Sequence, residues 1–130
     1  MGITMMYTGL LGLWFLALSV RVIQGRGSSG ISLGDGGDAL LQRRVRGHGN
    51  FAEYVPLILL MLGFLEYAAS PAWLLHLLGA TLLIARLGHG YALAFHTNFP
   101  PGRLVGTTGT LLALLVASLA CLWQAAGSLA

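Results

Sequence analysis

Long apolar runs alternate with short polar segments along the whole chain, and this pattern predicts four membrane-spanning helices. The expected spans cover about residues 3–23, 39–69, 72–95 and 103–126. A helix needs about 20 mostly apolar residues to cross the hydrocarbon core of a bilayer, and each run supplies them. No period-two alternation typical of strands is present. The expected fold is therefore an all-α membrane protein, an antiparallel four-transmembrane-helix bundle in one domain, residues 1–130.

Turn and cap residues place the expected helix boundaries. Glycines crowd residues 24–38, so we expect no regular structure there. Asp38 is the expected N-cap of the second helix. Ser70 and Pro71 are the expected N-cap and first residue of the third helix, which leaves a very short connection before it. Pro56 falls inside the second span, where a membrane helix tolerates proline and can kink at it.

Composition and charge agree with a membrane location. Hydrophobic residues make up 56% of the chain and charged residues only 8%, against about 25% charged residues in soluble domains. The net charge is +3, and all seven basic residues are arginines. Because most of them lie in or beside the first and third loops, the positive-inside rule explains them better than nucleic-acid binding does. That rule predicts cytoplasmic polar loops and both termini on the non-cytoplasmic side.

The first span and the cysteine content exclude two further features. The first span has no charge before Arg21 and no basic segment ahead of it, so we interpret it as a retained helix rather than a cleaved signal peptide. Cys121 is the single cysteine, which excludes a disulfide within the chain. The histidines lack the spacing of a metal motif, and the glycine-rich segment lacks the ending of a phosphate-binding loop.

The strongest functional pattern lies where the second span meets the membrane edge. Arg46, Asn50 and Glu53 follow one another at i, i+4 and i+7, which places them on one helical face. A cation, an amide and an anion on one face can hold a small zwitterionic ligand that carries carboxylates. The alternative is a structural network in which Arg46 pairs with Glu53. Tyr54 lies about 100° further around the helix, as a ligand contact or an interfacial anchor.

A second polar stripe follows one face of the third span. Arg86, His89, Leu93 and His96 are spaced at i, i+3, i+7 and i+10, and we expect the stripe to face inward. The alternative is that Arg86 snorkels to lipid phosphates. His48 lies about 200° from Arg46 around its helix, so it cannot easily serve the same pocket within one subunit.

Arg103 opens the fourth span, although the helix dipole does not favour a cation there. The residue therefore has another task, such as snorkelling or stabilising an anion like a thiolate. Gly102 and Gly106 at i, i+4 form a small-residue face suited to close helix packing. Of the other basic residues, Arg43 and Arg44 are expected to contact lipid headgroups and to set orientation.

These motifs together resemble one family, the MAPEG family of membrane-associated proteins in eicosanoid and glutathione metabolism. The second span carries the pattern Arg43-x-x-Arg46-x-His48-x-Asn50-x-x-Glu53-Tyr54-x-Pro56, the third span carries Ala85-Arg86-Leu87-Gly88-His89, and Arg103 starts the fourth. The resemblance covers nearly the whole chain and is strongest to the bacterial branch. One departure is Leu93, which stands where characterised enzymes often have a tyrosine.

The resemblance implies a homotrimer in a bacterial inner membrane, with glutathione sites between adjacent subunits that open toward the cytoplasm. Arg103 would stabilise the glutathione thiolate. The residues implied to hold glutathione within one subunit are Arg46, Asn50, Glu53, Tyr54, Arg86 and His89. His48 and either Arg21 or Arg26 would come from the neighbouring subunit.

The function implied is a glutathione-dependent transferase or peroxidase, which acts on a lipophilic electrophile or hydroperoxide that enters from the membrane lipids. One alternative is a non-catalytic membrane scaffold of the same fold that binds lipids or other ligands, because a fold does not guarantee chemistry. A third possibility is a small oligomeric transporter, which would need a charged residue in the transport path. Glu66 is the only mid-chain candidate, and Ser70 and Pro71 place it at the far membrane interface instead.

Overall fold

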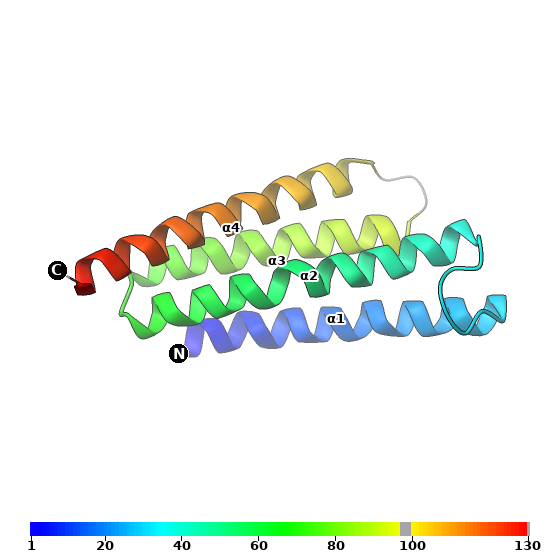
Figure 1. Ribbon diagram of the computed structural model, residues 1–130, viewed down its shortest axis with the longest axis horizontal. Coiled ribbons are helices and arrows are strands. Elements are labelled where there is room, and N and C mark those ends of the chain that lie inside the picture. Colours follow the sequence, from blue (N-terminus) through cyan, green and yellow to red (C-terminus); the bar gives the residue numbers. More distant parts are fainter. Residues whose placement is uncertain (97–99, 130) are drawn as a thin grey trace.

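Four long helices pack side by side in the computed structural model, which describes residues 1–96 and 100–129 (Figure 1). The helices are α1 (Gly2–Ser29), α2 (Ala39–Tyr67), α3 (Ala72–Ala94) and α4 (Pro100–Leu129). All four are long and apolar enough to cross a membrane. The chain runs up and down, so both termini lie at one end of the bundle. The expected all-α four-helix architecture is confirmed.

The prediction that residues 24–38 lack regular structure is wrong for the first part of this segment. Helix α1 continues through Gly25 and Gly27 and ends at Ser29, where Gly30 adopts a left-handed conformation with φ of 67°. A glycine inside a helix costs only about 1 kcal/mol relative to alanine. The hydroxyl of Ser29 also donates to the carbonyl oxygen of Gly25, at 2.9 Å. The irregular loop is therefore limited to residues 30–38.

Arg26 organises that loop. Its Nη1 atom donates to the carbonyl oxygens of Ser32 and Gly34, at 3.0 and 3.1 Å, and lies 3.5 Å from that of Ile31. Carbonyls that follow a helix end lack helical donors, and a guanidinium in the last turn satisfies several of them at once. At the other end of the loop, the expected N-cap of α2 is confirmed, because the Asp38 carboxylate accepts from two backbone N–H groups.

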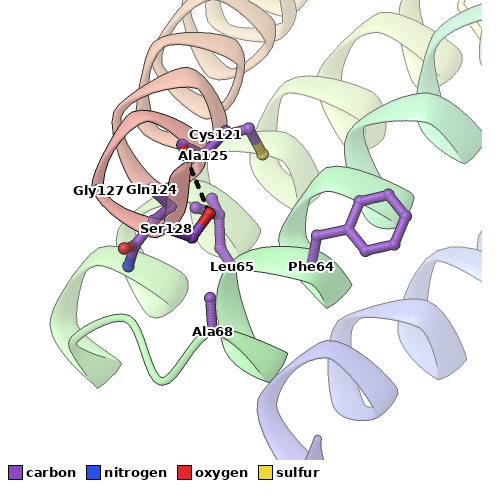
Figure 2. A pocket seen from close by; sticks show the side chains of 8 residues that line it. All are labelled: Phe64, Leu65, Ala68, Cys121, Gln124, Ala125, Gly127 and Ser128. Carbon is purple, nitrogen blue, oxygen red and sulfur yellow. Dashed lines mark hydrogen bonds between the residues drawn. The ribbon is translucent and has the colours of Figure 1, made fainter. Parts of the chain in front are cut away.

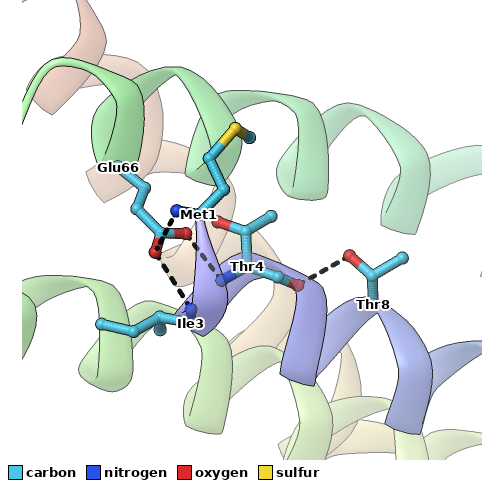
Figure 3. Close-up of polar contacts among 5 residues, drawn as sticks. All are labelled: Met1, Ile3, Thr4, Thr8 and Glu66. Carbon is cyan, nitrogen blue, oxygen red and sulfur yellow. Dashed lines mark hydrogen bonds and ion pairs between the residues drawn. The ribbon is translucent and has the colours of Figure 1, made fainter.

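The opposite end of the bundle is held by two polar contacts that the sequence pattern does not reveal. The Glu66 carboxylate of α2 accepts from the backbone N–H groups of Ile3 and Thr4, at 3.0 and 2.8 Å, and so caps the start of α1 (Figure 3). Ser70 was predicted to be the N-cap of α3, which is wrong. Its hydroxyl instead accepts from the Gln124 side chain at 3.0 Å and ties the α2–α3 turn to α4.

Helix α1 packs on α3 through two aromatic side chains that lie over glycines. A Cβ atom on Gly79 would be 2.2 Å from the ring of Tyr7, and one on Gly90 would be 2.8 Å from the indole nitrogen of Trp14. The indole N–H of Trp14 donates to the backbone oxygen of Arg86, at 3.0 Å. These contacts fix the position of α1 along the axis of α3, the helix that carries the buried Arg86.

Helices α3 and α4 are in contact through their backbones, whereas α1 meets α3 through side chains. This confirms the expected role of the small residues in α4. A Cβ atom on Gly106 would lie 2.5 Å from the Cβ atom of His89 and 2.7 Å from the carbonyl oxygen of Ala85. In a membrane, small residues permit such backbone contact and the dispersion energy that comes with it. The close approach also brings α4 within reach of side chains on α2 and α3.

We predict that Gly106→Ala destabilises the bundle, because the added methyl group must displace backbone atoms of α3. Overpacking of this kind costs about 1–3 kcal/mol. The measurement is thermal unfolding of purified protein in detergent micelles. Gly9→Ala is the matched control, since a Cβ atom there meets nothing within 4 Å, and it should keep or raise the unfolding temperature. Equal unfolding temperatures for the two variants would contradict the packing described.

We also predict that Arg26→Gln loosens the loop of residues 30–38 without unfolding the bundle, because the three loop carbonyls lose their shared donor. Limited digestion with a protease that does not require arginine should cut this loop faster in the variant. Arg21→Gln is the control, since Arg21 makes no hydrogen bond to that loop in the described structure. Unchanged cleavage of Arg26→Gln would show that the loop holds itself without this side chain.

Candidate functional site

Two hollows lie between α2, α3 and α4, and five of the side chains predicted to bind a ligand line them: Asn50, Tyr54, Arg86, His89 and Arg103. Arg46 and Glu53 line neither hollow. The outer one is an open groove of about 360 Å³, lined by His89, Pro100, Arg103, Leu104 and Thr107. The inner one is a small cavity of about 30 Å³, lined by Asn50, Tyr54, Arg86, Thr107, Thr110 and Leu111. Thr107 borders both hollows, so the inner cavity lies next to the groove.

Arg86 stands at the centre of this region, and its side chain is 2% exposed. One terminal nitrogen donates to Oδ1 of Asn50 at 2.8 Å, and the other donates to the carbonyl oxygen of Gly106 at 3.1 Å. Neither ion pair found among residues 1–96 and 100–129 includes it. The expected inward orientation is confirmed, and the alternative of snorkelling to lipid is wrong. A buried guanidinium with neutral partners leaves an uncompensated positive charge at the cavity.

Arg46 and Glu53 form an ion pair on the outer surface of α2. The distance from Nη1 of Arg46 to Oε1 of Glu53 is 3.2 Å, and the two side chains are 64% and 51% exposed. The pairing considered as the alternative is therefore present. Because an exposed pair of this kind contributes about 0–1 kcal/mol, it is a weak structural element. Both charged groups remain open to exchange this partner for a ligand.

The face of α3 that contains Arg86 is buried for two turns. His89 is 7% exposed and Leu93 is 6% exposed, as the inward stripe predicts. His96 is exposed, so its assignment to the stripe is wrong, because α3 ends at Ala94. His89 lines the outer groove together with Arg103, and Arg86 lies one turn earlier on the same helix. That Arg46, Arg86 and Arg103 serve one binding site stays a prediction.

Arg21 and Arg43 lie at the C-terminal end of α3. Nε of Arg21 donates to the carbonyl oxygen of Ala94 at 3.2 Å, and its guanidinium lies 4.9 Å from the ring centre of Phe95. Arg43 donates to the carbonyl oxygens of Ala92 and His96, at 2.8 and 3.0 Å. Both residues satisfy helix-terminal carbonyls. The expectation that Arg43 contacts headgroups is replaced by this capping role.

His48 packs against α1 of its own chain. Its ring stacks on Phe15 with 4.6 Å between centroids, and its Nε2 atom lies 3.2 Å from the Ser19 hydroxyl. His48, Arg21 and Arg26 therefore border neither hollow in the chain described. Their contribution to the site of a neighbouring subunit stays a prediction.

A separate groove of about 590 Å³ lies between α2 and α4 at the end that carries the termini (Figure 2). Its lining includes Phe64, Leu65 and Ser128, and the half-buried Cys121. The thiol of Cys121 donates to the carbonyl oxygen of Met61, at 3.7 Å. None of the described residues that line this groove is charged, so they do not offer the chemistry of the arginine-rich region.

The groups around the two hollows suit an anionic or zwitterionic organic molecule. Guanidinium groups bind carboxylates through paired hydrogen bonds, and Glu53 offers an acceptor for an ammonium group. Within the described ranges, no three His, Cys, Asp or Glu side chains gather as a metal site would require.

Comparison with known proteins gives the same family as the sequence motifs. The sequence model of the MAPEG family matches residues 4–123. Two curated relatives, both named inner membrane protein YecN, come from Escherichia coli strains K12 and O6:H1. Each is 35% identical to this chain over 121 residues, which cover 93% of this chain and 91% of the relative. No solved structure matches. The chain, with its four membrane-spanning helices, belongs to the MAPEG family.

Proposed function

We propose that this protein binds glutathione and acts as a glutathione-dependent membrane transferase or peroxidase. The observation that carries the proposal is the buried guanidinium of Arg86 at the inner cavity, beside the groove that Arg103 and His89 line. The Arg46–Glu53 ion pair lies on the helical face that also carries Asn50. When bound, glutathione supplies a nucleophilic sulfur that can add to a lipophilic electrophile or reduce a hydroperoxide. The chain itself supplies the charges that bind, orient and stabilise the anionic form.

The charges of the site and of the ligand are complementary. Three guanidinium groups and one carboxylate give the site an excess of two positive charges. Glutathione has two carboxylates and one ammonium group, so its thiolate form carries an excess of two negative charges. A site with this charge favours the thiolate over the thiol, because each charge is stabilised by an opposite charge.

Each side chain then has a distinct part in binding. Glu53 accepts hydrogen bonds from the ammonium group, while Arg46 binds a carboxylate in place of its present partner. Tyr54 lines the inner cavity and His89 the outer groove. Arg103 lies in the wall of the open groove, where its guanidinium can stabilise a sulfur anion. The groove is the side from which a lipophilic substrate would arrive from the membrane.

We further propose a homotrimer in the bacterial inner membrane, with the arginine-rich end toward the cytoplasm. The location is supported by the name of the relatives, and the orientation by the positive-inside rule. Assembly is supported by the exposure of the Arg46–Glu53 pair, because a charged pair on the outside of a membrane bundle is better placed against protein than against lipid. In the trimer, His48 and Arg21 or Arg26 would face the neighbouring site.

We predict that substitutions of Arg103 and Glu53 have different effects, because one residue is proposed to stabilise the thiolate and the other to bind the ammonium group. Arg103→Leu should lower turnover with a chlorodinitrobenzene or hydroperoxide substrate by about 10²-fold, because a group that stabilises developing charge is removed, with a smaller change in the Kd for glutathione. Glu53→Gln should mainly raise that Kd. The measurements are calorimetry, steady-state kinetics and the ultraviolet absorbance of the bound thiolate. If Arg103→Leu keeps both its turnover and its thiolate absorbance, the proposed role of Arg103 is refuted.

The same experiment separates the enzyme from a binding scaffold. A scaffold of this fold would bind lipophilic ligands without glutathione, and adding glutathione would produce no thiolate absorbance. Gly9→Ala is a suitable control, because a Cβ atom there meets nothing within 4 Å and the residue borders neither hollow.

For the assembly, we predict that native mass spectrometry of protein released from detergent micelles gives three copies per particle. Substituting the exposed pair together, Arg46→Leu with Glu53→Leu, should shift the distribution toward smaller species if the pair faces a neighbouring subunit. A wild-type protein that stays monomeric at all concentrations would exclude the trimer.

A further inference from the structure

We infer that Arg86 is a positioning residue, which fixes the side-chain amide of Asn50 so that its two N–H groups are directed to the ligand. Asn50 thereby becomes a donor for a carboxylate or carbonyl oxygen and cannot serve as the acceptor for an ammonium group. The part of this inference that concerns the ligand rests on the proposed function, whereas the orientation of the amide does not.

The orientation follows from the chemistry of the two groups in contact. A guanidinium has five N–H donors and no acceptor. The atom of Asn50 that lies 2.8 Å from the terminal nitrogen of Arg86 must therefore be its oxygen, because an NH₂ group there would set donor against donor. An amide on an exposed helical face could rotate to either orientation, and here one of the two is excluded.

Arg86 can impose this orientation because it cannot move away. Its side chain is 2% exposed, and its second terminal nitrogen donates to the carbonyl oxygen of Gly106. That oxygen also accepts from the Thr110 hydroxyl at 2.7 Å, and Gly106 is held by the tight contact with His89. The guanidinium therefore bridges α2, α3 and α4, and the anchor on α4 is backbone rather than a flexible side chain.

As a consequence, Asn50 and Glu53 have different hydrogen-bonding roles on one face of α2. With its oxygen committed to Arg86, Asn50 has two N–H groups left, and no hydrogen bond from them is found among the described residues. The half-buried Asn50 side chain lines the inner cavity. One turn along the helix, Glu53 provides the acceptor. This face of α2 therefore presents hydrogen-bond donors at Asn50 and an acceptor at Glu53. A zwitterion would bind with its carboxylate toward Asn50 and its ammonium group toward Glu53.

The first arm of the test needs no ligand. In Asn50→Asp the carboxylate still accepts from Arg86, so the Tm of the full-length protein in detergent should stay within error of wild type or rise. In Asn50→Leu the guanidinium loses its acceptor inside the bundle, so the Tm should fall. Equal losses of Tm in the two variants would overturn the claim that Arg86 holds the oxygen of this side chain.

The second arm observes the N–H groups directly. Asn50 and Asn98 are the only asparagines in the chain, so protein labelled with ¹⁵N-asparagine has only two side-chain NH₂ signals, and Asn98→Asp assigns them. Saturating glutathione should shift the Asn50 signals. The shift should be reduced in Arg86→Met, where the amide is free to rotate. Asn50 signals that stay in place while glutathione binds would overturn the inference.

Affinity completes the test. Asn50→Asp loses both donors and adds a negative charge, so the Kd for glutathione should rise about tenfold or more, which is about 1.4 kcal/mol. Gln124→Glu, the corresponding change from amide to carboxylate at the end of the bundle that carries the termini, should leave the Kd unchanged. An unchanged Kd in Asn50→Asp would contradict the donor role. If the wild-type protein binds no glutathione, the proposed function fails, while the Tm comparison still decides the orientation of the amide.

Discussion

A guanidinium buried among four apolar helices must find its hydrogen-bond partners within the protein, because the hydrocarbon of the bilayer offers none. Arg86 meets this constraint by donating to Asn50 on α2 and to the backbone of Gly106 on α4. Both contacts require the helices to lie at one height and close together. The glycine at position 106 permits that closeness, and Trp14 fixes α1 against the backbone of Arg86 itself. The bundle is thus arranged around one buried cation.

The same constraint connects the fold to its chemistry. The partners of Arg86 are neutral, so they accept from its two terminal nitrogens without cancelling its charge, and its Nε atom has no partner among the described residues. Arg103 adds a second cation at the neighbouring groove, while the charge of Arg46 is matched by Glu53. Among the described residues, neither Arg86 nor Arg103 takes part in an ion pair, and this favours an anionic ligand. This is the physical basis on which the glutathione proposal rests, in addition to membership of the MAPEG family.

The arginines that looked alike in the sequence have separate tasks in the structure. Arg26 closes the loop after α1, and Arg21 and Arg43 satisfy the last carbonyls of α3. Arg46 and Arg103 are exposed, and Arg86 is buried. Charge alone could not separate these roles, because each depends on which carbonyl or cavity lies within a side chain's reach.

The sequence by itself determined the four spans, the cap at Asp38 and the inward face of α3, because each depends on residues near one another in the chain. The small residues Gly102 and Gly106 likewise predicted that α4 packs closely against another helix. Only the tertiary structure decided that α1 continues to Ser29 and that Glu66 caps its start. It also decided that the Ser70 hydroxyl accepts a hydrogen bond from Gln124 of α4 and that Arg86 donates one to the Asn50 side chain. These contacts join residues distant in sequence, and their geometry exists only once the helices have packed.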